Sequence, residues 1–185
     1  MAKLKAELPS GRTYHSLEHT LDVYASAIDI GEREGVGEED MVLLRTAALF
    51  HDAGFLLQDL EHEEASCRIV REHLPRWGFS ASQIDRICNM IMATRIPQTP
   101  HDKLSRILCD ADLDYLGRDD FFQVGEGLFL ELKAYGVLRT RREWNELQDK
   151  FLSHHHYHTR TNKDLREPRK KEHLEEVRRL LREGD

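Results

Sequence analysis

Apolar residues recur at intervals of three and four along most of this chain, and no segment shows the strict alternation that is typical of a half-buried strand. Near the N-terminus, Leu17, Leu21, Tyr24 and Ile28 follow this spacing. Because such spacing places apolar side chains on one face of a helix, the chain is predicted to be all-α. Glycine and proline residues set the expected helix ends. Helices are expected at about 16–34, 38–51, 61–75, 80–95, 104–111, 119–135, 140–154 and 164–182.

The length and composition indicate one globular domain. The chain has 185 residues, of which 39% are hydrophobic and 33% are charged. This is enough to bury a core, and the hydrophobic share is above that of disordered chains. Because no internal repeat or long linker divides it, the range 1–185 is predicted to form a single compact helical bundle. Residues 14–117 carry the motifs, and helices from 119 to 182 complete the bundle.

The net charge, the length of the apolar runs and the cysteines indicate which partners and which cell compartment are expected. A net charge of −7 disfavours bulk binding to nucleic-acid backbones, which depends on Lys and Arg. No apolar run approaches the ~20 residues that span a bilayer, and the N-terminus lacks the apolar segment of a signal peptide. Cys67, Cys88 and Cys109 lie well apart. They are expected to be buried free thiols in a reducing compartment, so a cytoplasmic protein is predicted.

The dipeptide His51-Asp52 places two polar side chains at the end of an apolar helix, just before Gly54. Residues 47–50 are Ala, Ala, Leu and Phe, which indicates that this helix end is buried. Burying an unpaired carboxylate is costly, so Asp52 needs a cation, hydrogen-bond donors or water. A chance His-Asp pair on a surface turn is the alternative, and the dipeptide gains weight only from its surroundings.

Two other segments offer ligands for a cation. His15 and His19 are four residues apart and would share one face of a helix if both are helical, although such pairs also occur without a metal. Residues 108–114 read Leu-Cys-Asp-Ala-Asp-Leu-Asp and present alternating carboxylates at the end of an apolar helix. Acidic groups there oppose the helix dipole, so a bound cation explains them better than a solvated helix end does.

The order His, His-Asp, Asp resembles the HD-domain superfamily of metal-dependent phosphohydrolases, over about residues 14–117. The resemblance implies that His19, His51, Asp52 and Asp112 bind a divalent cation, with Asp112 matching the Ala-Asp step of the family. Such mixed ligands suit Mn²⁺, Fe²⁺, Zn²⁺ or Mg²⁺. The implied reaction is cleavage of a phosphate ester, in a nucleotide or another small phosphorylated metabolite, by a water that the metal activates.

The resemblance also implies roles for residues around the metal. Residues 14–23 are similar to the opening motif of cyclic-nucleotide phosphodiesterases, in which the first histidine protonates the leaving group. His15 is therefore the candidate general acid. Asp52 is expected to accept a proton from the water as well as to bind metal, and Asp110 to orient a ligand histidine. Phosphomonoesterase and phosphodiesterase activity both stay open.

Further candidates concern the substrate and the number of metals. HD proteins with two metals tend to carry more histidines near the position of His62 and on the next helix, where this chain has Thr94. A single metal is therefore favoured, with His62 and Arg95 contacting a substrate phosphate. The planar guanidinium of Arg95 can donate two hydrogen bonds to a phosphate. An ordinary surface salt bridge is the alternative for Arg95.

Residues 154–158 read His-His-His-Tyr-His, and four histidines at one helix end cannot all face one cation. His156 or His158 is expected to reach the substrate, with Lys171 as a further anion contact. Stabilisation of a helix C-terminus by these histidines is an equally good interpretation.

Two other functions compete with the phosphohydrolase. A di-iron HD-type oxygenase would need more protein ligands, and Thr94 counts against it. A non-catalytic HD signalling module that binds a nucleotide would usually have lost ligands, whereas all four are present. The expected partner is a small phosphorylated substrate, with no membrane. Residues 121–135 could supply a homodimer face as easily as a core.

Overall fold

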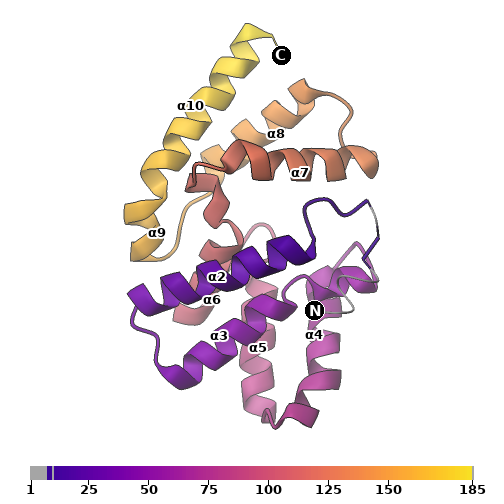
Figure 1. The fold of residues 1–185 in the computed structure, drawn as a ribbon, viewed down its shortest axis with the longest axis vertical. Helices are drawn as coiled ribbons and strands as arrows, with labels where there is room; N and C mark the ends of the chain where they lie inside the picture. The colour runs from indigo at the N-terminus through magenta and orange to yellow at the C-terminus, as the bar shows by residue number, and fades with distance from the viewer. Residues whose placement is uncertain (1–7, 10, 185) are drawn as a thin grey trace. The chain divides into compact units, whose positions relative to one another are not determined.

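The computed structural model describes residues 8–9 and 11–184, and these contain α-helices and short 3₁₀ helices but no β-strand (Figure 1). The prediction of an all-α fold is confirmed. The α-helices are α2 (Leu17–Arg33), α3 (Glu38–Phe50), α4 (His62–His73), α5 (Ala81–Ala93), α6 (Lys103–Asp112), α7 (Phe121–Ala134), α8 (Arg141–His154), α9 (Arg160–Leu165) and α10 (Glu167–Glu183). The 3₁₀ helices are η1 (Ala53–Leu56), η2 (Leu74–Trp77) and η3 (Asp114–Gly117).

The described chain divides into two compact units. The N-terminal unit contains residues 8–9 and 15–112, with helices α2 to α6, and the C-terminal unit contains residues 11–14 and 113–184, with helices α7 to α10. After residues 11–14 the chain therefore returns to the N-terminal unit at residue 15 and leaves it after residue 112. The expectation of one domain over the whole chain stays a prediction.

In the N-terminal unit, α2 packs against α3 and α6, and α5 packs against α3, α4 and α6. The apolar faces of these helices form its core, which includes the fully buried side chains of Ala27, Leu44, Ile87, Ile91 and Leu108. Burying one large aliphatic side chain contributes about 1.5–3 kcal/mol relative to leaving it exposed. This core fixes the positions of the helix ends that carry the predicted metal ligands.

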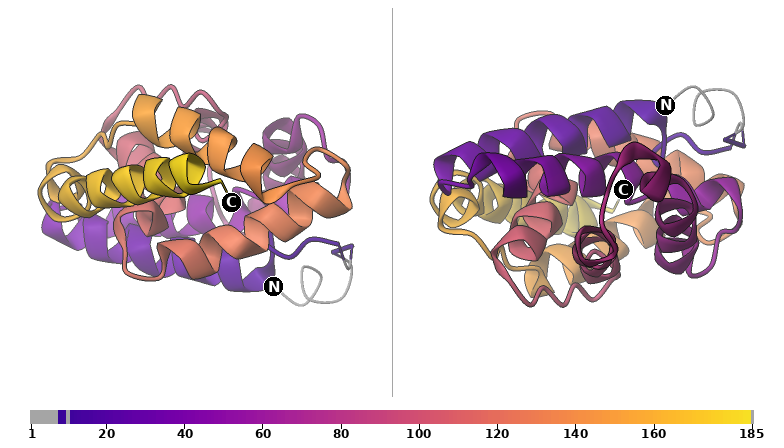
Figure 2. Two further views of the ribbon diagram at one scale, coloured as in Figure 1. Left: turned by 90° about the horizontal axis from the view of Figure 1, so that it is seen from above. Right: turned by 90° about the horizontal axis from the view of Figure 1, so that it is seen from below.

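In the C-terminal unit, α10 lies alongside α8 and also packs on η3 (Figure 2). Residues 11–14 are tied to α7, because the buried Glu131 accepts hydrogen bonds from the Arg12 guanidinium at 2.7 Å and from the Tyr14 amide at 2.9 Å. This tie holds the chain immediately before it enters the N-terminal unit at His15.

The last predicted helix, 164–182, is wrong as one element. In the structure α9 ends at Leu165, and α10 begins two residues later with Pro168 in its first turn. Proline has no amide hydrogen and suits the first turn of a helix, where that hydrogen has no partner. The junction also packs closely on Gly117, where a Cβ would lie 2.3 Å from the Arg166 carbonyl oxygen.

Several local predictions are confirmed. Ser80 and Gln83 form a reciprocal capping box at the start of α5. Cys67, Cys88 and Cys109 are free and buried. Within the described residues, no helix combines the length and apolar character that crossing a bilayer requires.

Candidate metal centre

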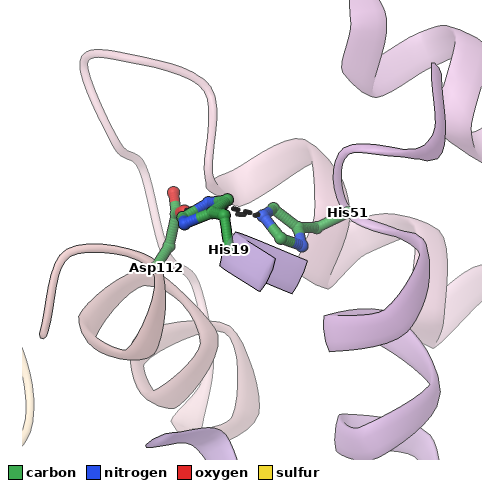
Figure 3. Close-up of side chains that lie close together, drawn as sticks. All are labelled: His19, His51 and Asp112. Atoms are coloured by element: carbon green, nitrogen blue, oxygen red, sulfur yellow. Dashed lines mark hydrogen bonds and ion pairs between the residues drawn. The ribbon is translucent and has the colours of Figure 1, made fainter. Parts of the chain in front are cut away.

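Four predicted ligands come from the ends of three helices in the N-terminal unit. His19 lies in the first turn of α2, His51 and Asp52 directly follow α3, and Asp112 is the last residue of α6. Figure 3 shows the side chains of His19, His51 and Asp112 lying close together. Since each helix end is fixed by the core, these side chains are held together by the fold.

The donor atoms of these side chains lie close enough to share one ion. Nε2 of His19 lies 3.4 Å from Nε2 of His51. Oδ1 of Asp112 lies 3.2 Å from the His19 nitrogen and 3.5 Å from the His51 nitrogen. These three residues offer donor atoms that all lie within 4.8 Å of one another.

Asp52 adds a fourth donor. Its Oδ2 lies 3.2 Å from Nε2 of His51 and 3.5 Å from Nε2 of His19. Asp52 is 7% exposed, and this oxygen is buried without a hydrogen-bond partner. A buried carboxylate oxygen without a hydrogen bond is unfavourable unless a cation balances its charge.

A backbone carbonyl group fixes the tautomer of His51 that can bind a metal. Its Nδ1 lies 2.8 Å from the carbonyl oxygen of Ala48, and only a protonated Nδ1 can donate to that acceptor. In the neutral ring the lone pair is then on Nε2, which faces the two carboxylates. Carbonyl groups commonly fix the tautomer of metal-binding histidines in this way.

The cluster favours positive charge at its centre. Burial lowers the pKa of His51, but the carboxylates of Asp52 and Asp112 outweigh burial and raise this pKa well above its usual value. Burial raises the pKa of Asp112, whereas its contacts with His19 and His51 lower it to about 2. Burial likewise opposes ionisation of Asp52, but His51 holds the pKa of Asp52 well below its usual value. Both carboxylates are therefore ionised at neutral pH and need a cationic partner.

The donor set fits a divalent cation. Bonds of about 2.0–2.2 Å place neighbouring ligand atoms around a tetrahedral or octahedral ion roughly 3.0–3.5 Å apart. The separations given above, 3.2–3.5 Å, fall in this range. Two imidazoles and two carboxylates form a mixed nitrogen and oxygen set of the kind that Mn²⁺, Fe²⁺ and Zn²⁺ accept.

The turn after the His-Asp pair is tied to the start of α4. The buried hydroxyl of Ser66 donates to the His51 carbonyl oxygen at 2.7 Å and accepts from the Gly54 amide at 2.8 Å. Gly54 is required by this packing, since a Cβ there would lie 1.9 Å from the carbonyl oxygen of His62. The tie brings His62 next to Asp52.

His62 and His15 lie beside the four ligands. Nε2 of His62 is 3.4 Å from Oδ1 of Asp52, the oxygen other than the one that approaches the ligand histidines. His15 precedes Ser16, the residue that caps α2, so His15 and His19 do not share a helical face. The His15 ring nevertheless lies 6.1 Å from the His19 ring and 6.4 Å from the His62 ring.

The ring of Phe55 packs against both of these histidines. It stacks on the His62 ring at 3.9 Å with an interplanar angle of 17°, and lies 4.5 Å from the His15 ring at 45°. Phe55 belongs to η1 and is 6% exposed. No sequence motif singles out Phe55, and its only signal is its place three residues after Asp52.

Arg95 is held by two carboxylates. Its guanidinium donates to Oε2 of Glu63 at 3.0 Å and also contacts Glu64. Glu63 is buried, and its other oxygen lies 3.5 Å from Nε2 of His62. A single carboxylate thus joins Arg95 to His62, an arrangement that the sequence analysis missed. Contact of Arg95 with a substrate phosphate stays a prediction.

Two residues on neighbouring helices complete the surroundings. Asp110 is fully buried in α6, and its role in orienting a ligand histidine stays a prediction. Thr94, which stands where two-metal relatives tend to have histidine, donates its hydroxyl to the Ile91 carbonyl oxygen at 2.8 Å. This hydrogen bond stabilises the C-terminal end of α5.

The remaining candidates belong to the C-terminal unit. His156 and Lys171 are exposed, and His158 is half-buried. At the end of α8, Nδ1 of His154 donates to the carbonyl oxygen of Lys150 at 2.7 Å, as expected of a histidine that stabilises a helix C-terminus. Substrate contact by His156, His158 and Lys171 stays a prediction.

The fold and the cluster together define a class of protein. It is an all-helical protein in which a His-Asp pair at one helix end joins a histidine and an aspartate from two other helices. A family model described as HD domain matches residues 16–114, which is more than half of the chain and includes all four predicted ligands. The chain therefore belongs to the HD domain family, and the predicted resemblance is confirmed. HD domains generally bind divalent metals, and His19, His51 and Asp112 form a possible site.

A solved structure is also similar. It is the crystal structure of a predicted HD superfamily hydrolase from an uncultured Thermotogales bacterium, 25% identical in sequence, with a TM-score of 0.59. The similarity covers 92% of this chain and 82% of that one. No curated protein matches the chain.

Proposed function

We propose that this protein is a metal-dependent phosphohydrolase, acting in the cytoplasm on a phosphate ester of a nucleotide or another small metabolite. The observation that carries the proposal is the buried Oδ2 of Asp52, which lies within 3.5 Å of two imidazole nitrogens and has no hydrogen bond. The family and the similar hydrolase structure support hydrolysis as the general type of reaction. The phosphate ester is what the resemblance of the ligand motifs to metal-dependent phosphohydrolases implies.

The proposed reaction uses the ligands and one histidine beside them. His19, His51, Asp52 and Asp112 would hold a divalent cation, which supplies Lewis-acid activation of a water and of a phosphoryl oxygen. Asp52 is ionised at neutral pH and accepts the proton of the attacking water. His15 gives a proton to the leaving oxygen.

The proposed phosphate contacts lie on the Oδ1 side of Asp52. His62 donates to a phosphate oxygen there. Arg95, whose side chain is 39% exposed, exchanges Glu64 for the phosphate and keeps the buried Glu63 as its second partner. His156, His158 and Lys171, in the C-terminal unit, are retained as proposed substrate contacts.

The test combines metal analysis with activity. Untagged protein is analysed for metal by mass spectrometry and screened with phosphomonoesters and phosphodiesters in Mn²⁺, Mg²⁺ and Zn²⁺. One equivalent of metal is expected, together with cleavage of a monoester to alcohol and phosphate or of a diester to alcohol and phosphomonoester. Asp52→Asn and His51→Ala should each lower kcat/KM by about 10³-fold or more, because each loses a ligand and the Lewis-acid activation that depends on it. Asp29→Asn, which loses only an exposed pair with Arg33, is the control and should leave kcat/KM unchanged.

Other outcomes would contradict the proposal in different ways. Turnover like that of the wild type in Asp52→Asn or His51→Ala would exclude this cluster as the active site. Two equivalents of iron with oxygen uptake and no phosphate release would favour the oxygenase. Nucleotide binding without turnover would favour a signalling module.

A further inference from the structure

The Phe55 ring contacts the rings of both His15 and His62. His15 is the proposed proton donor, and His62 is the proposed phosphate ligand. We propose that Phe55 is a positioning residue, whose ring holds both imidazoles for cleavage of a phosphate ester of an aliphatic alcohol. This inference rests on the proposed function and names its substrate class.

The position of the Phe55 ring is set by the turn that also sets Asp52. The Phe55 amide donates to the Asp52 carbonyl oxygen at 3.1 Å, and the Leu57 amide donates to the Gly54 carbonyl oxygen at 2.8 Å. The Gly54 amide is held in turn by the buried Ser66 hydroxyl. The backbone that carries the Phe55 ring is thus held to Asp52 and to α4 by hydrogen bonds.

The two histidines lie at the starts of their helices. His15 lies just before Ser16, the cap of α2. His62 is the first residue of α4 and follows Glu61, whose φ of 55° is left-handed. A stacked aromatic partner shifts side-chain populations by roughly two- to tenfold. Phe55 supplies this restraint to both imidazoles at once, at 3.9 and 4.5 Å.

A positioned proton donor matters most when the leaving group is basic. In the proposed step the bond from phosphorus to the leaving oxygen breaks and a bond from phosphorus to the water oxygen forms. Asp52 takes the water proton, and the proton of His15 goes to the leaving oxygen. An aliphatic alkoxide cannot leave without that proton, whereas a nitrophenolate can. The histidine pair therefore suits esters of aliphatic hydroxyl groups, such as those of a sugar.

The experiment compares two leaving groups on Phe55 variants. Phe55→Leu and Phe55→Met remove the ring, and Phe55→Tyr keeps it. Each is assayed with a p-nitrophenyl ester and an alkyl ester of the class, monoester or diester, that the wild type cleaves. Loss of the ring should lower kcat for the alkyl ester by roughly 10- to 100-fold, part of the full effect of a general acid. For the p-nitrophenyl ester kcat should change by less than about threefold, because weaker phosphate contact by His62 raises KM for both esters alike, and Phe55→Tyr should resemble the wild type.

The C-terminal unit offers a matched control. Phe121 is 1% exposed and stacks on His173 at 4.5 Å and 11°, which is a similar contact without a proposed role in catalysis. Phe121→Leu should lower the unfolding free energy and leave the ratio of the two kcat values unchanged. A general loss of packing would instead affect both substrates and both variants alike.

A second readout is independent of activity. In metal-free protein, the carbon-bound ring protons of His15 and His62 should resonate upfield, since they lie against an aromatic ring. Phe55→Leu and Phe55→Met should remove this shift, and Phe55→Tyr should keep it. Unchanged histidine resonances, or equal losses of kcat for both esters, would overturn the positioning role. Absence of activity in the wild type towards any phosphate ester would overturn the proposed function instead.

Discussion

At Gly54 the lack of a side chain allows the His-Asp turn to touch the first turn of α4. A Cβ at this position would lie 1.9 Å from the His62 carbonyl oxygen and 2.7 Å from the Ser66 amide nitrogen. Both are backbone atoms and cannot move aside as a flexible side chain would. Gly54→Ala is therefore expected to lower the unfolding free energy by about 3 kcal/mol, measured by urea denaturation.

The matched control for this change is Gly37→Ala. No atom lies within 4 Å of a Cβ at Gly37, and its φ of −71° suits any residue. Equal stabilities for the two variants would contradict the close approach at Gly54. Gly54→Ala should also weaken metal binding, because the same turn holds Asp52.

Residues of the metal centre differ in how far the sequence could predict them. The local context of Asp52 and Asp112 indicated a cation, because carboxylates at buried helix ends need one. The roles of Phe55, Glu63 and Ser66 depend on contacts that form only when the His-Asp turn meets α4. No pattern of neighbouring residues encodes such contacts, so these side chains were not singled out.

Helix α6 ends in the candidate ligand Asp112, and its start depends on Asp102. Oδ1 of Asp102 accepts hydrogen bonds from the Ser105 amide at 2.8 Å and from the Ser105 hydroxyl at 2.7 Å. Burial alone would raise the pKa of Asp102, but these hydrogen bonds outweigh it and lower the pKa below its usual value. The ionised carboxylate is therefore the form that stabilises the helix.

The pH dependence of stability follows from this shift. A carboxyl group with a lowered pKa contributes its full stability above its unfolded pKa of about 3.9, and loses it as pH falls through the folded value. Asp102→Asn should cost roughly 0.5–1 kcal/mol at pH 7 and progressively less below pH 4, measured by urea unfolding across pH. Asp29→Asn serves as the exposed control, and an identical pH profile in the two variants would contradict this role of Asp102.

Most helices were predictable to within a few residues, because their periodic apolar faces and their stop signals agree. Ser80 and Thr140 mark helix starts through local hydrogen bonds that the sequence alone encodes. The break at Arg166 was missed, since it depends on packing against Gly117 as well as on Pro168. The 3₁₀ helices were missed because three or four residues carry no periodicity.

For the whole protein, metal binding should raise stability. Ions that bind only the folded chain stabilise it by about 2.7 kcal/mol at a concentration of 100 Kd. For a chain of 185 residues this corresponds to an increase in Tm of roughly 5–10 °C. Thermal unfolding in Mn²⁺ and in excess chelator measures the difference.

The variant Asp52→Asn tests whether the stabilising ion binds at this site or elsewhere on the protein. The variant loses a charged ligand and should keep at most a small part of the increase in Tm. An undiminished increase would show that the stabilising ion binds elsewhere on the chain.

The all-α class of the whole molecule was predictable, because helical periodicity extends over the full sequence. Its division into two compact units was not, because it depends on which helices contact one another. The tie between Glu131 on α7 and residues 11–14 is one such contact across a long stretch of sequence. The sequence around Glu131 does not predict which residues its side chain will contact.

The continuous stretch 15–112 contains all four ligands and begins and ends beside them. His15 opens it within 6.1 Å of the His19 ring, and Asp112 closes it 3.2 Å from the same histidine. A segment whose two ends lie close together can be inserted into another protein. The recipient residues on either side of the insertion then do not have to move apart. Evolution can thus exchange the flanking helices while the four candidate ligands are inherited together.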